Sequence, residues 1–352
     1  MVKNNIFAIG VMSGTSLDGI DLVYVHFNED KYADFKIIHA ETIAYSKEWK
    51  QLLQNAIFSD ETELQKLDRT YGKYLGNIIN HFISNYKILK VDFIASHGHT
   101  ILHQPEKGIT LQIGAGNEIA KITKQKVVCD FRTQDVKLGG QGAPLVPIGD
   151  ELLFSEYDFC LNLGGFSNIS YHTEGVRIAF DICPVNIVLN FYVQKLNLEF
   201  DASGKIASEG KINTALLETL NLVAFYQKVP PKSLGLEWVQ KEIFPLIDRL
   251  ETDIPSILRT FVEHIAMQIG GVIYKNNAVL STGGGVFNTF LMNRIEYHAK
   301  NSMKLPTQEL IDFKEALVFA FLGYLKIKHQ VNCLKSVTGA RKNHSSGVIF
   351  YP

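Results

Sequence analysis

Gly14-Thr15-Ser16-Leu17-Asp18-Gly19 is a glycine-bounded turn between two strand-like segments, residues 6–12 and 20–27. A third strand-like segment follows at residues 35–45, so the chain opens as a β-meander. Two helical patterns come next, at residues 47–58 and 61–86. A meander that continues into helices predicts an α/β fold.

The same turn carries groups that suit a phosphate. Its two glycines can adopt positive φ and expose consecutive backbone N–H groups to an anion. Thr15 and Ser16 add hydroxyl donors, while Asp18 or Asp21 could hold Mg²⁺ directly or through water. The alternative is a plain hairpin turn, for which Asp-Gly is a common signal.

The opening pattern recurs in the second half of the chain. A strand at residues 159–163 leads through Gly164-Gly165 into strands at residues 169–172 and 176–182, and helices follow. The two halves therefore suggest a structural duplication, although two unrelated hairpins would give the same pattern.

Composition favours a globular protein that acts on a small molecule. A length of 352 residues exceeds the usual single-domain size, which favours two domains around a cleft. With 35 Lys+Arg against 36 Asp+Glu, the net charge gives no general attraction to nucleic acid or to an anionic membrane. No signal-peptide pattern or membrane-length apolar stretch is present, so we expect a cytoplasmic protein with no membrane or nucleic-acid partner.

A second candidate anion site is Thr282-Gly283-Gly284-Gly285, which follows a predicted strand and precedes a predicted helix. Backbone amides and a helix N-terminus both favour a nucleotide at such a place. Three adjacent glycines lose much backbone entropy when the chain folds. A role in which a ligand closely approaches the backbone is therefore favoured over a role as a simple connecting loop. The P-loop pattern is absent from the chain, so a nucleotide would have to be bound by a different architecture.

Asp181 follows an apolar strand and precedes Pro184, so its carboxylate is a candidate general base at a strand tip. A carboxylate that accepts the nucleophile's proton would complete the minimum set for phosphoryl transfer. The alternative is a helix N-cap before Pro184.

Other polar residues allow two interpretations each. His97 with His99 and His103 suggests a metal site, but ligand spacing is lacking, and a sugar contact or a satisfied interior histidine fits His97 equally well. Arg132 is a substrate clamp or part of a salt-bridged turn. Glu315 opens an apolar helix and is either a first-turn dipole partner or a residue that reaches the cleft.

The cysteines form no recognisable motif. They are far apart, with neither a C-x-x-C pair nor a Cys/His cluster of zinc spacing, and we expect reduced buried thiols at Cys129, Cys160, Cys183 and Cys333.

Several strings resemble the anhydro-N-acetylmuramic acid kinase family. Residues 10–21 resemble the N-terminal signature of this family. Further segments that resemble family motifs are Ser96-His97-Gly98-His99-Thr100, Thr110-Leu111-Gln112-Ile113-Gly114, Asp130-Phe131-Arg132, residues 139–147, Asn162-Leu163-Gly164-Gly165, Pro230-Pro231-Lys232-Ser233, Thr282-Gly283-Gly284-Gly285 and Val337-Thr338-Gly339-Ala340.

The resemblance implies two duplicated ribonuclease-H-like (actin-like ATPase) domains with a central cleft. We place the first at residues 1–130 plus about 335–352 and the second at residues 131–334, with a hinge near residues 130–150. The resemblance also implies a sugar kinase that uses ATP and Mg²⁺. Such an enzyme hydrolyses the 1,6-anhydro bridge of anhydro-N-acetylmuramic acid and phosphorylates O6, and it acts in peptidoglycan recycling. Relatives further suggest a homodimer.

Site residues carried over from the family follow the motifs. Asp181 resembles the catalytic base. The phosphates and Mg²⁺ would lie against Gly14, Thr15, Ser16, Leu17, Asp18, Gly19, Ile20 and Asp21, with Asp18 as the metal ligand. The nucleotide would also contact Gly164, Gly165, Gly283, Gly284 and Gly285. The sugar or its lactyl carboxylate would contact His97, Arg132 and Glu315.

The chain departs from the family pattern beside the proposed base. Asp181-Ile182-Cys183-Pro184-Val185-Asn186 replaces the usual D-T-G-P-G-N, which puts side chains where backbone had close access. Ala115-Gly116 replaces the usual Asp-Pro, and Leu236 stands where arginine is common. We expect catalysis to survive, while rate and substrate choice are left open, as are nucleotide preference and oligomeric state. The alternatives are a kinase for another anhydro-sugar or amino sugar, and a catalytically weak ATP- or sugar-binding sensor.

Overall fold

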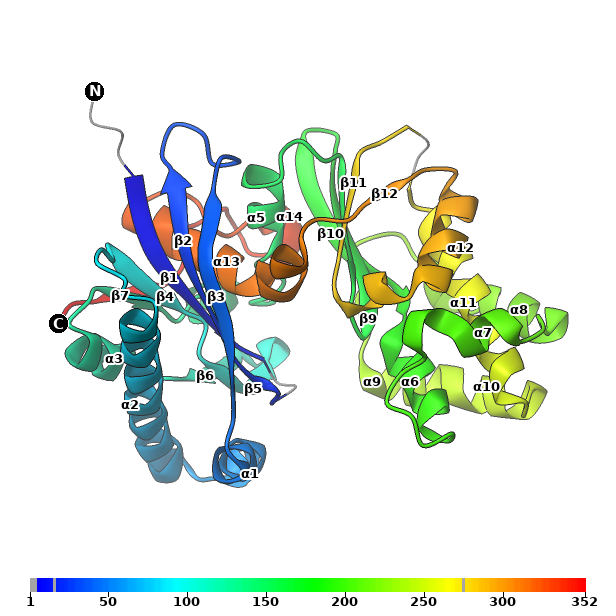
Figure 1. Cartoon of the computed structure of the whole chain (residues 1–352), viewed down its shortest axis with the longest axis horizontal. Helices are drawn as coiled ribbons and strands as arrows, with labels where there is room; N and C mark the ends of the chain where they lie inside the picture. Colours follow the sequence, from blue (N-terminus) through cyan, green and yellow to red (C-terminus); the bar gives the residue numbers. More distant parts are fainter. Residues whose placement is uncertain (1–4, 15–16, 274–275) are drawn as a thin grey trace. The chain divides into compact units, whose positions relative to one another are not determined.

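The computed structural model describes residues 5–14, 17–273 and 276–352. The chain divides into two compact units (Figure 1). Unit 1 comprises Met1–Leu153 and Phe313–Pro352, and unit 2 comprises Phe154–Asp312. Each unit is built around its own β-sheet.

The sheet of unit 1 has the strand order β13-β7-β4-β1-β2-β3. Its strands are β1 (Asn5–Ser13), β2 (Gly19–Asn28), β3 (Lys36–Ala44), β4 (Phe93–Ser96), β7 (Val127–Cys129) and β13 (Val348–Phe350). The β1–β2 and β2–β3 pairs are antiparallel, and the β1–β4 and β4–β7 pairs are parallel. A separate hairpin consists of β5 (His99–Gln104) and β6 (Ile109–Ile113).

The sheet of unit 2 repeats this topology. Its order is β10-β9-β8-β11-β12, with strands β8 (Phe159–Leu163), β9 (Phe166–Thr173), β10 (Val176–Pro184), β11 (Val279–Thr282) and β12 (Met303–Lys304). The β8–β9 and β9–β10 pairs are antiparallel, and the β8–β11 and β11–β12 pairs are parallel. Each sheet thus places its first five strands in the order 3-2-1-4-5, which confirms the predicted duplicated α/β fold.

Unit 1 also contains helices and short turns. They are α1 (Lys47–Asn55), α2 (Glu61–Asn85), α3 (Gly116–Thr123), α4 (Thr133–Lys137), α5 (Pro147–Leu152), α14 (Lys335–Thr338) and most of α13 (Gln308–Ile327), with 3₁₀ turns η1 (Ala56–Phe58) and η2 (Pro105–Lys107). A capping box starts α2, because Asp60 accepts from the N–H of Glu63 while Glu63 accepts from that of Asp60. The buried face of α2 then carries Tyr71, Leu75 and Phe82 into the core.

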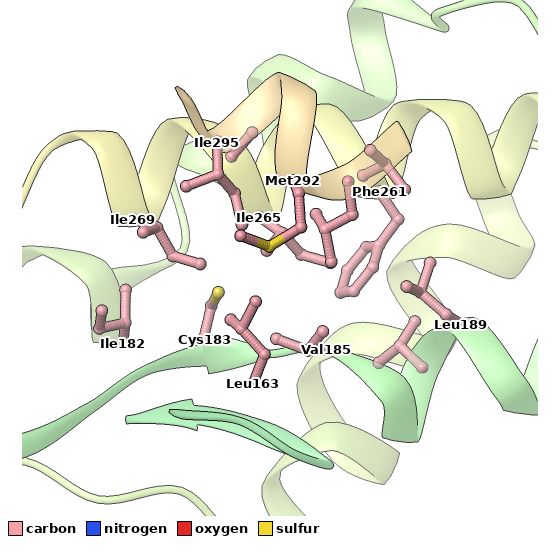
Figure 2. Close-up of a cluster of buried hydrophobic side chains, with 14 of the residues drawn as sticks. Leu163, Ile182, Cys183, Val185, Leu189, Phe261, Ile265, Ile269, Met292 and Ile295 are labelled. Carbon is pink, nitrogen blue, oxygen red and sulfur yellow. The ribbon is translucent and has the colours of Figure 1, made fainter. Parts of the chain in front are cut away.

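Helices of unit 2 pack on one face of its sheet. They are α6 (Asn186–Gln194), α7 (Lys205–Glu209), α8 (Thr214–Asn221), α9 (Leu236–Trp238), α10 (Phe244–Leu250), α11 (Ile254–Gly270) and α12 (Thr289–Ala299), with short turns η3 (Ala202–Gly204), η4 (Ala224–Gln227), η5 (Val239–Ile243) and η6 (Gly284–Phe287). Figure 2 shows Phe261, Ile265 and Ile269 of α11 directed toward Leu163 and Cys183 of the sheet. Burial of each such side chain stabilises the fold by about 1.5–3 kcal/mol.

Helix α13 lies against the sheet of unit 1 through small residues. An added Cβ at Gly10 of β1 would lie 2.1 Å from the backbone oxygen of Ala316, and one at Gly323 would lie 2.6 Å from Cβ of Ala95. Only glycine allows the helix backbone to approach the strand this closely.

The unit boundaries differ from the expected domain boundaries. The limits expected at residues 130/131 and 334/335 both fall inside unit 1, and so does the whole of the expected hinge at 130–150. The cause is that α4 and α5 belong to unit 1, as does α13 from Phe313 onward. Among the described residues, no helix has the length and hydropathy needed to cross a bilayer.

Candidate active site

A row of polar residues crosses four strands of the unit 2 sheet. Asp181 of β10 pairs with Asn168 of β9, Asn168 pairs with Asn162 of β8, and Asn162 pairs with Thr282 of β11. Directly paired residues point to the same face of a sheet, and their chain neighbours point to the other. The neighbours Phe180, Ile182, Leu161 and Leu163 all lie in the core. The polar row therefore occupies the face opposite the helices.

Asp181 is half-buried at an irregularity in β10, where the register with β9 shifts between Asp181 and Cys183. Its Oδ2 accepts a hydrogen bond from the backbone N–H of Leu234 at 2.8 Å. Burial raises the pKa of its carboxyl, and the bond from Leu234 partly opposes that rise. A carboxylate with a raised pKa is a better proton acceptor than an exposed one.

One expectation about this segment and one alternative are wrong. Asp181 is not a helix N-cap, since α6 begins at Asn186 with Val185 at the N-cap position. It is also not at a strand tip, because β10 continues to Pro184. The side chains that depart from the family pattern do not crowd the polar face either: Ile182, Cys183 and Val185 lie in the core of unit 2, as Figure 2 shows.

The two glycine turns of unit 2 lie next to each other at the ends of β8 and β11. An added Cβ at Gly283, where φ is +84°, would lie 2.6 Å from Oδ1 of Asn162, and one at Gly285 would lie 2.8 Å from Cβ of Leu163. Packing on β8 thus accounts for two of the three glycines. Gly284 is different, because its added Cβ would meet nothing within 4 Å.

Gly164 and Gly165 connect this region to the segment that follows Asp181. The carbonyl of Gly165 accepts from the N–H groups of Val185 and Ile187, at 2.8 and 3.2 Å. An added Cβ at Gly165 would meet only ordinary van der Waals contact, at 3.9 Å from Ile187. Unit 2 therefore brings together Asp181 and five of the predicted nucleotide-binding glycines at one edge of its sheet.

The predicted phosphate turn of unit 1 joins β1 to β2. Thr15 and Ser16 lie outside the described residues. The positive φ occurs at Leu17 (+61°), whose N–H donates to Gly14 at 3.4 Å, and not at the two glycines as expected. Gly19 is required for another reason, since an added Cβ would lie 2.8 Å from the backbone oxygen of Ile43 on the neighbouring strand.

The side chains around this turn divide into two groups. Asp18 is exposed, and Asp21 accepts from the Thr42 hydroxyl through Oδ1 at 2.6 Å. Ile20 is fully buried in the core of unit 1. The two aspartates can thus offer oxygen atoms to a cation, whereas Ile20 contributes packing.

Unit 1 also joins two predicted sugar contacts directly. Arg132 donates from Nε to Nε2 of His97 at 3.0 Å and from Nη1 to the carbonyl of Gly142 at 2.7 Å. The other ring nitrogen of His97 bonds to the carbonyl of Gly98 at 2.8 Å, so Nδ1 carries the proton and the ring is neutral. Burial and the Arg132 charge hold the pKa of His97 well below its usual range.

Glu315 lies inside α13, which begins at Gln308, so the expectation of a first-turn dipole partner is wrong. Its side chain reaches solvent, yet the surrounding protein desolvates it enough to raise the pKa of its carboxyl. Arg132 opposes this rise and Asp21 adds to it. Glu315, Arg132 and Asp21 therefore form one charged neighbourhood with His97 in unit 1.

Sequence reasoning missed several polar residues near the candidate site. Asn162, Asn168 and Thr282 join the row only through strand register, which a single strand's pattern does not reveal. The buried ion pair between Lys314 Nζ and Asp150 Oδ1, at 2.7 Å, anchors α13 one residue before Glu315. The sequence signal that could have indicated this ion pair is Lys314 itself, a charged residue just before the apolar part of α13.

The sequence model of anhydro-N-acetylmuramic acid kinase matches residues 6–352. The chain belongs to the anhydro-N-acetylmuramic acid kinase family. The family member from Mannheimia succiniciproducens is 34% identical over 372 residues, which cover 98% of each chain. That from Haemophilus influenzae is 32% identical over 377 residues, covering 98% of this chain and 97% of its own.

Among solved structures, component A of the Acidaminococcus fermentans (R)-2-hydroxyglutaryl-CoA dehydratase is similar to this anhydro-N-acetylmuramic acid kinase family member at 12% identity and a TM-score of 0.49. That match covers 92% of this chain and 99% of the solved one.

Proposed function

We propose that the chain is an ATP-dependent kinase that hydrolytically opens 1,6-anhydro-N-acetylmuramic acid and phosphorylates O6, giving N-acetylmuramic acid 6-phosphate and ADP. Membership of the family over residues 6–352 carries this proposal. The half-buried Asp181, with its raised pKa and its place in the polar row, supports it.

Asp181 acts as the general base. It takes a proton from the water that attacks the anomeric carbon, the new bond joins this carbon to the water oxygen, and the bond between the carbon and O6 breaks. The released O6 then bonds to the γ-phosphorus as ADP leaves, and Asp181 releases its proton to solvent. The oxygen atoms of water and of the anhydro bridge therefore both stay in the product. Positioning and charge stabilisation supply most of the remaining acceleration.

The nucleotide contacts fall to the glycine turns. Gly284 supports this role, because an open Cα face lets a ligand approach the backbone. Gly164 and Gly165, and the turn from Gly14 to Asp21, are proposed to hold the phosphates. Mg²⁺ fits the exposed carboxylate of Asp18 with support from Asp21, since it prefers one or two carboxylates plus phosphate oxygens, and it would neutralise phosphate charge.

Arg132, His97 and Glu315 are proposed to bind the sugar. The planar guanidinium of Arg132 suits the lactyl carboxylate, and its bonds to His97 and Gly142 fix its orientation. The core location of Ile182, Cys183 and Val185 favours the family substrate over another anhydro-sugar, because these residues leave the polar face unchanged.

Mass spectrometry of a reaction with ATP, Mg²⁺ and anhydro-N-acetylmuramic acid tests the proposal. We expect N-acetylmuramic acid 6-phosphate, with one labelled oxygen at the anomeric carbon when the reaction runs in ¹⁸O-water. Anhydro-glucose serves as the comparison substrate. Turnover of that sugar without turnover of the muramic acid derivative would favour the alternative of a different substrate.

Replacement of Gly284 by alanine tests the nucleotide contact. We expect the KM for ATP to rise about tenfold, because the methyl group would occupy space that the ligand needs. The melting temperature should stay unchanged, since the added Cβ meets no protein atom within 4 Å. Gly271→Ala, at a helix end with no contact under 3.4 Å, is the control. Unaltered ATP kinetics in Gly284→Ala would remove this residue from the nucleotide site.

Replacement of Arg132 by lysine tests the sugar contact. We expect the KM for the sugar to rise about 10- to 100-fold, because lysine loses the planar fork and the bond to His97. The KM for ATP should remain as it was. Arg69→Lys, on the exposed side of α2, is the matched control. Equal effects on both substrates would argue against a specific sugar role.

A further inference from the structure

A buried Asp, Cys and His cluster lies within unit 1. Asp135 is on α4, while Cys333 and His344 face each other across an isolated antiparallel bridge. The N–H of each bonds to the carbonyl of the other, at 3.1 and 3.2 Å. The exposed fractions are 0% for Asp135, 1% for Cys333 and 5% for His344. Three potential metal ligands are thus fixed in the interior by backbone pairing.

The potential ligand atoms converge on one point. Sγ of Cys333 lies 3.1 Å from Oδ1 of Asp135, and Nε2 of His344 lies 3.5 Å from the same oxygen. All three atoms lie within 4.8 Å of one another. Ligand atoms of a tetrahedral zinc ion are separated by roughly 3.3–3.8 Å, as bond lengths near 2.0–2.3 Å require. The spacing therefore needs only a small adjustment to enclose an ion.

His344 directs toward Oδ1 of Asp135 a ring nitrogen that makes no hydrogen bond to any described residue. Its Nδ1 lies 3.1 Å from the carbonyl of Lys342, so Nδ1 carries a proton, and in the neutral ring Nε2 keeps a lone pair. Nε2 is buried and has no hydrogen-bond partner within the described part of the chain. A lone pair that faces a carboxylate is unfavourable unless a proton or a cation lies between them. A backbone carbonyl on the second ring nitrogen is also what orients metal-binding histidines.

Supporting groups hold Asp135 in place. Its Oδ2 accepts from the N–H of Gly142 at 2.7 Å, and its Oδ1 accepts from the Thr338 hydroxyl at 2.8 Å. Gly140 leaves room for the carboxylate, because an added Cβ would lie 2.2 Å from Oδ2. The carboxylate is therefore preorganised, with Thr338 at the edge of the cluster.

We propose that Asp135, Cys333 and His344 bind one Zn²⁺ ion, with Thr338 Oγ1 or a water molecule in the fourth position. A thiolate and an imidazole together select zinc over Mg²⁺ or Ca²⁺. The two charges of the ion balance those of Asp135 and the Cys333 thiolate, which leaves the buried site neutral. Binding breaks the S–H bond of Cys333, forms a metal–sulfur bond and releases one proton to solvent.

The ion would act as a clamp within unit 1. It would join the segment from Cys333 to His344 to α4, which begins directly after Arg132. Asp135 and Arg132 also share a partner, since Gly142 donates to the first and accepts from the second. The site is therefore structural, and it is separate from the Mg²⁺ expected at the nucleotide.

Zinc content and affinity test the clamp directly. Protein without a histidine tag is stripped with a chelator, dialysed against buffered Zn²⁺ and analysed by plasma mass spectrometry. We expect one zinc per chain, a higher melting temperature than for the stripped protein, and release of about one proton per ion at neutral pH. Less than a tenth of an equivalent would overturn the proposal.

Variants show whether bound zinc occupies this cluster. Cys333→Ser and His344→Ala should each lower the zinc affinity at least tenfold, and Cys160→Ala, another buried cysteine, should not. Substitution by cobalt gives a second measurement on the unmutated protein, because a thiolate-to-cobalt charge-transfer band requires a cysteine ligand. One zinc per chain without that band, or equal affinity in Cys333→Ser, would place the ion elsewhere and overturn the proposal.

Discussion

Asp181→Asn is expected to lower kcat by about 10²- to 10⁴-fold, the range for loss of a general base. The amide keeps the shape of the carboxylate and can still accept from the N–H of Leu234, but it cannot take a proton from water. Nucleotide binding should persist, because the glycine turns are untouched. Steady-state kinetics and calorimetric titration with an ATP analogue measure the two effects separately.

The pH dependence gives an independent check of Asp181. Because the pKa of Asp181 is raised, its carboxyl group loses its proton at a higher pH than an ordinary carboxyl group does. The acid limb of the profile of kcat against pH should therefore be shifted to higher pH. A raised carboxyl pKa also means that the stability contribution of this group is present at low pH and is lost as pH rises through the folded-state pKa. Asp181→Asn should therefore not lower the unfolding free energy at neutral pH.

Asp248→Asn is the matched control, since it lies in the same unit, is exposed and keeps an oxygen for Tyr192. We expect its kcat to equal that of the unmodified protein. Normal turnover in Asp181→Asn would exclude Asp181 as the base, whereas loss of both turnover and nucleotide binding would indicate a structural defect.

Gly10→Ala is expected to destabilise the fold by about 3 kcal/mol, the upper part of the range for overpacking. The new methyl group would lie 2.1 Å from the backbone oxygen of Ala316, which cannot rotate away as a side chain could. Helix α13 and strand β1 must then separate, and both carry core residues of unit 1. The melting temperature should fall by roughly 6–12 °C.

Differential scanning calorimetry measures this loss, with Gly271→Ala as the control for adding one methyl group to a glycine. A melting temperature unchanged by Gly10→Ala would contradict the close packing of α13 on β1. A fall of equal size in both variants would attribute the effect to glycine replacement in general.

Local patterns were sufficient to predict the elements that flank the candidate site. The helix expected at residues 61–86 is α2 (Glu61–Asn85), and the meander of unit 2 ends in β10 as expected to within two residues. Strong period-3.6 or strand-like patterns with turn residues at their ends explain this success. The halves of the duplication share topology but little sequence, which is why single-strand patterns only suggested it.

The features that could not be predicted from the sequence depend on contacts between residues that are far apart in the chain. Asp181 was expected at a strand tip because nothing in its own strand indicates where β9 stops pairing. Asp135, Cys333 and His344 were not connected, since their spacing matches no local metal motif and only the fold brings them together. Glu315 was assigned to a helix start because the preceding turns of α13 are polar.

The chain order of the units has a consequence for biosynthesis. Unit 2 is one continuous stretch, whereas unit 1 needs both ends of the polypeptide. On the ribosome, unit 2 can therefore finish folding while β1 still lacks the α13 residues that contact Gly10, and the edge strand β13 is synthesised after α13. Until α13 and β13 have been synthesised, the sheet of unit 1 exposes apolar surface, and nascent chains should depend on chaperones for longer in the unit 1 strands that are made first than in unit 2.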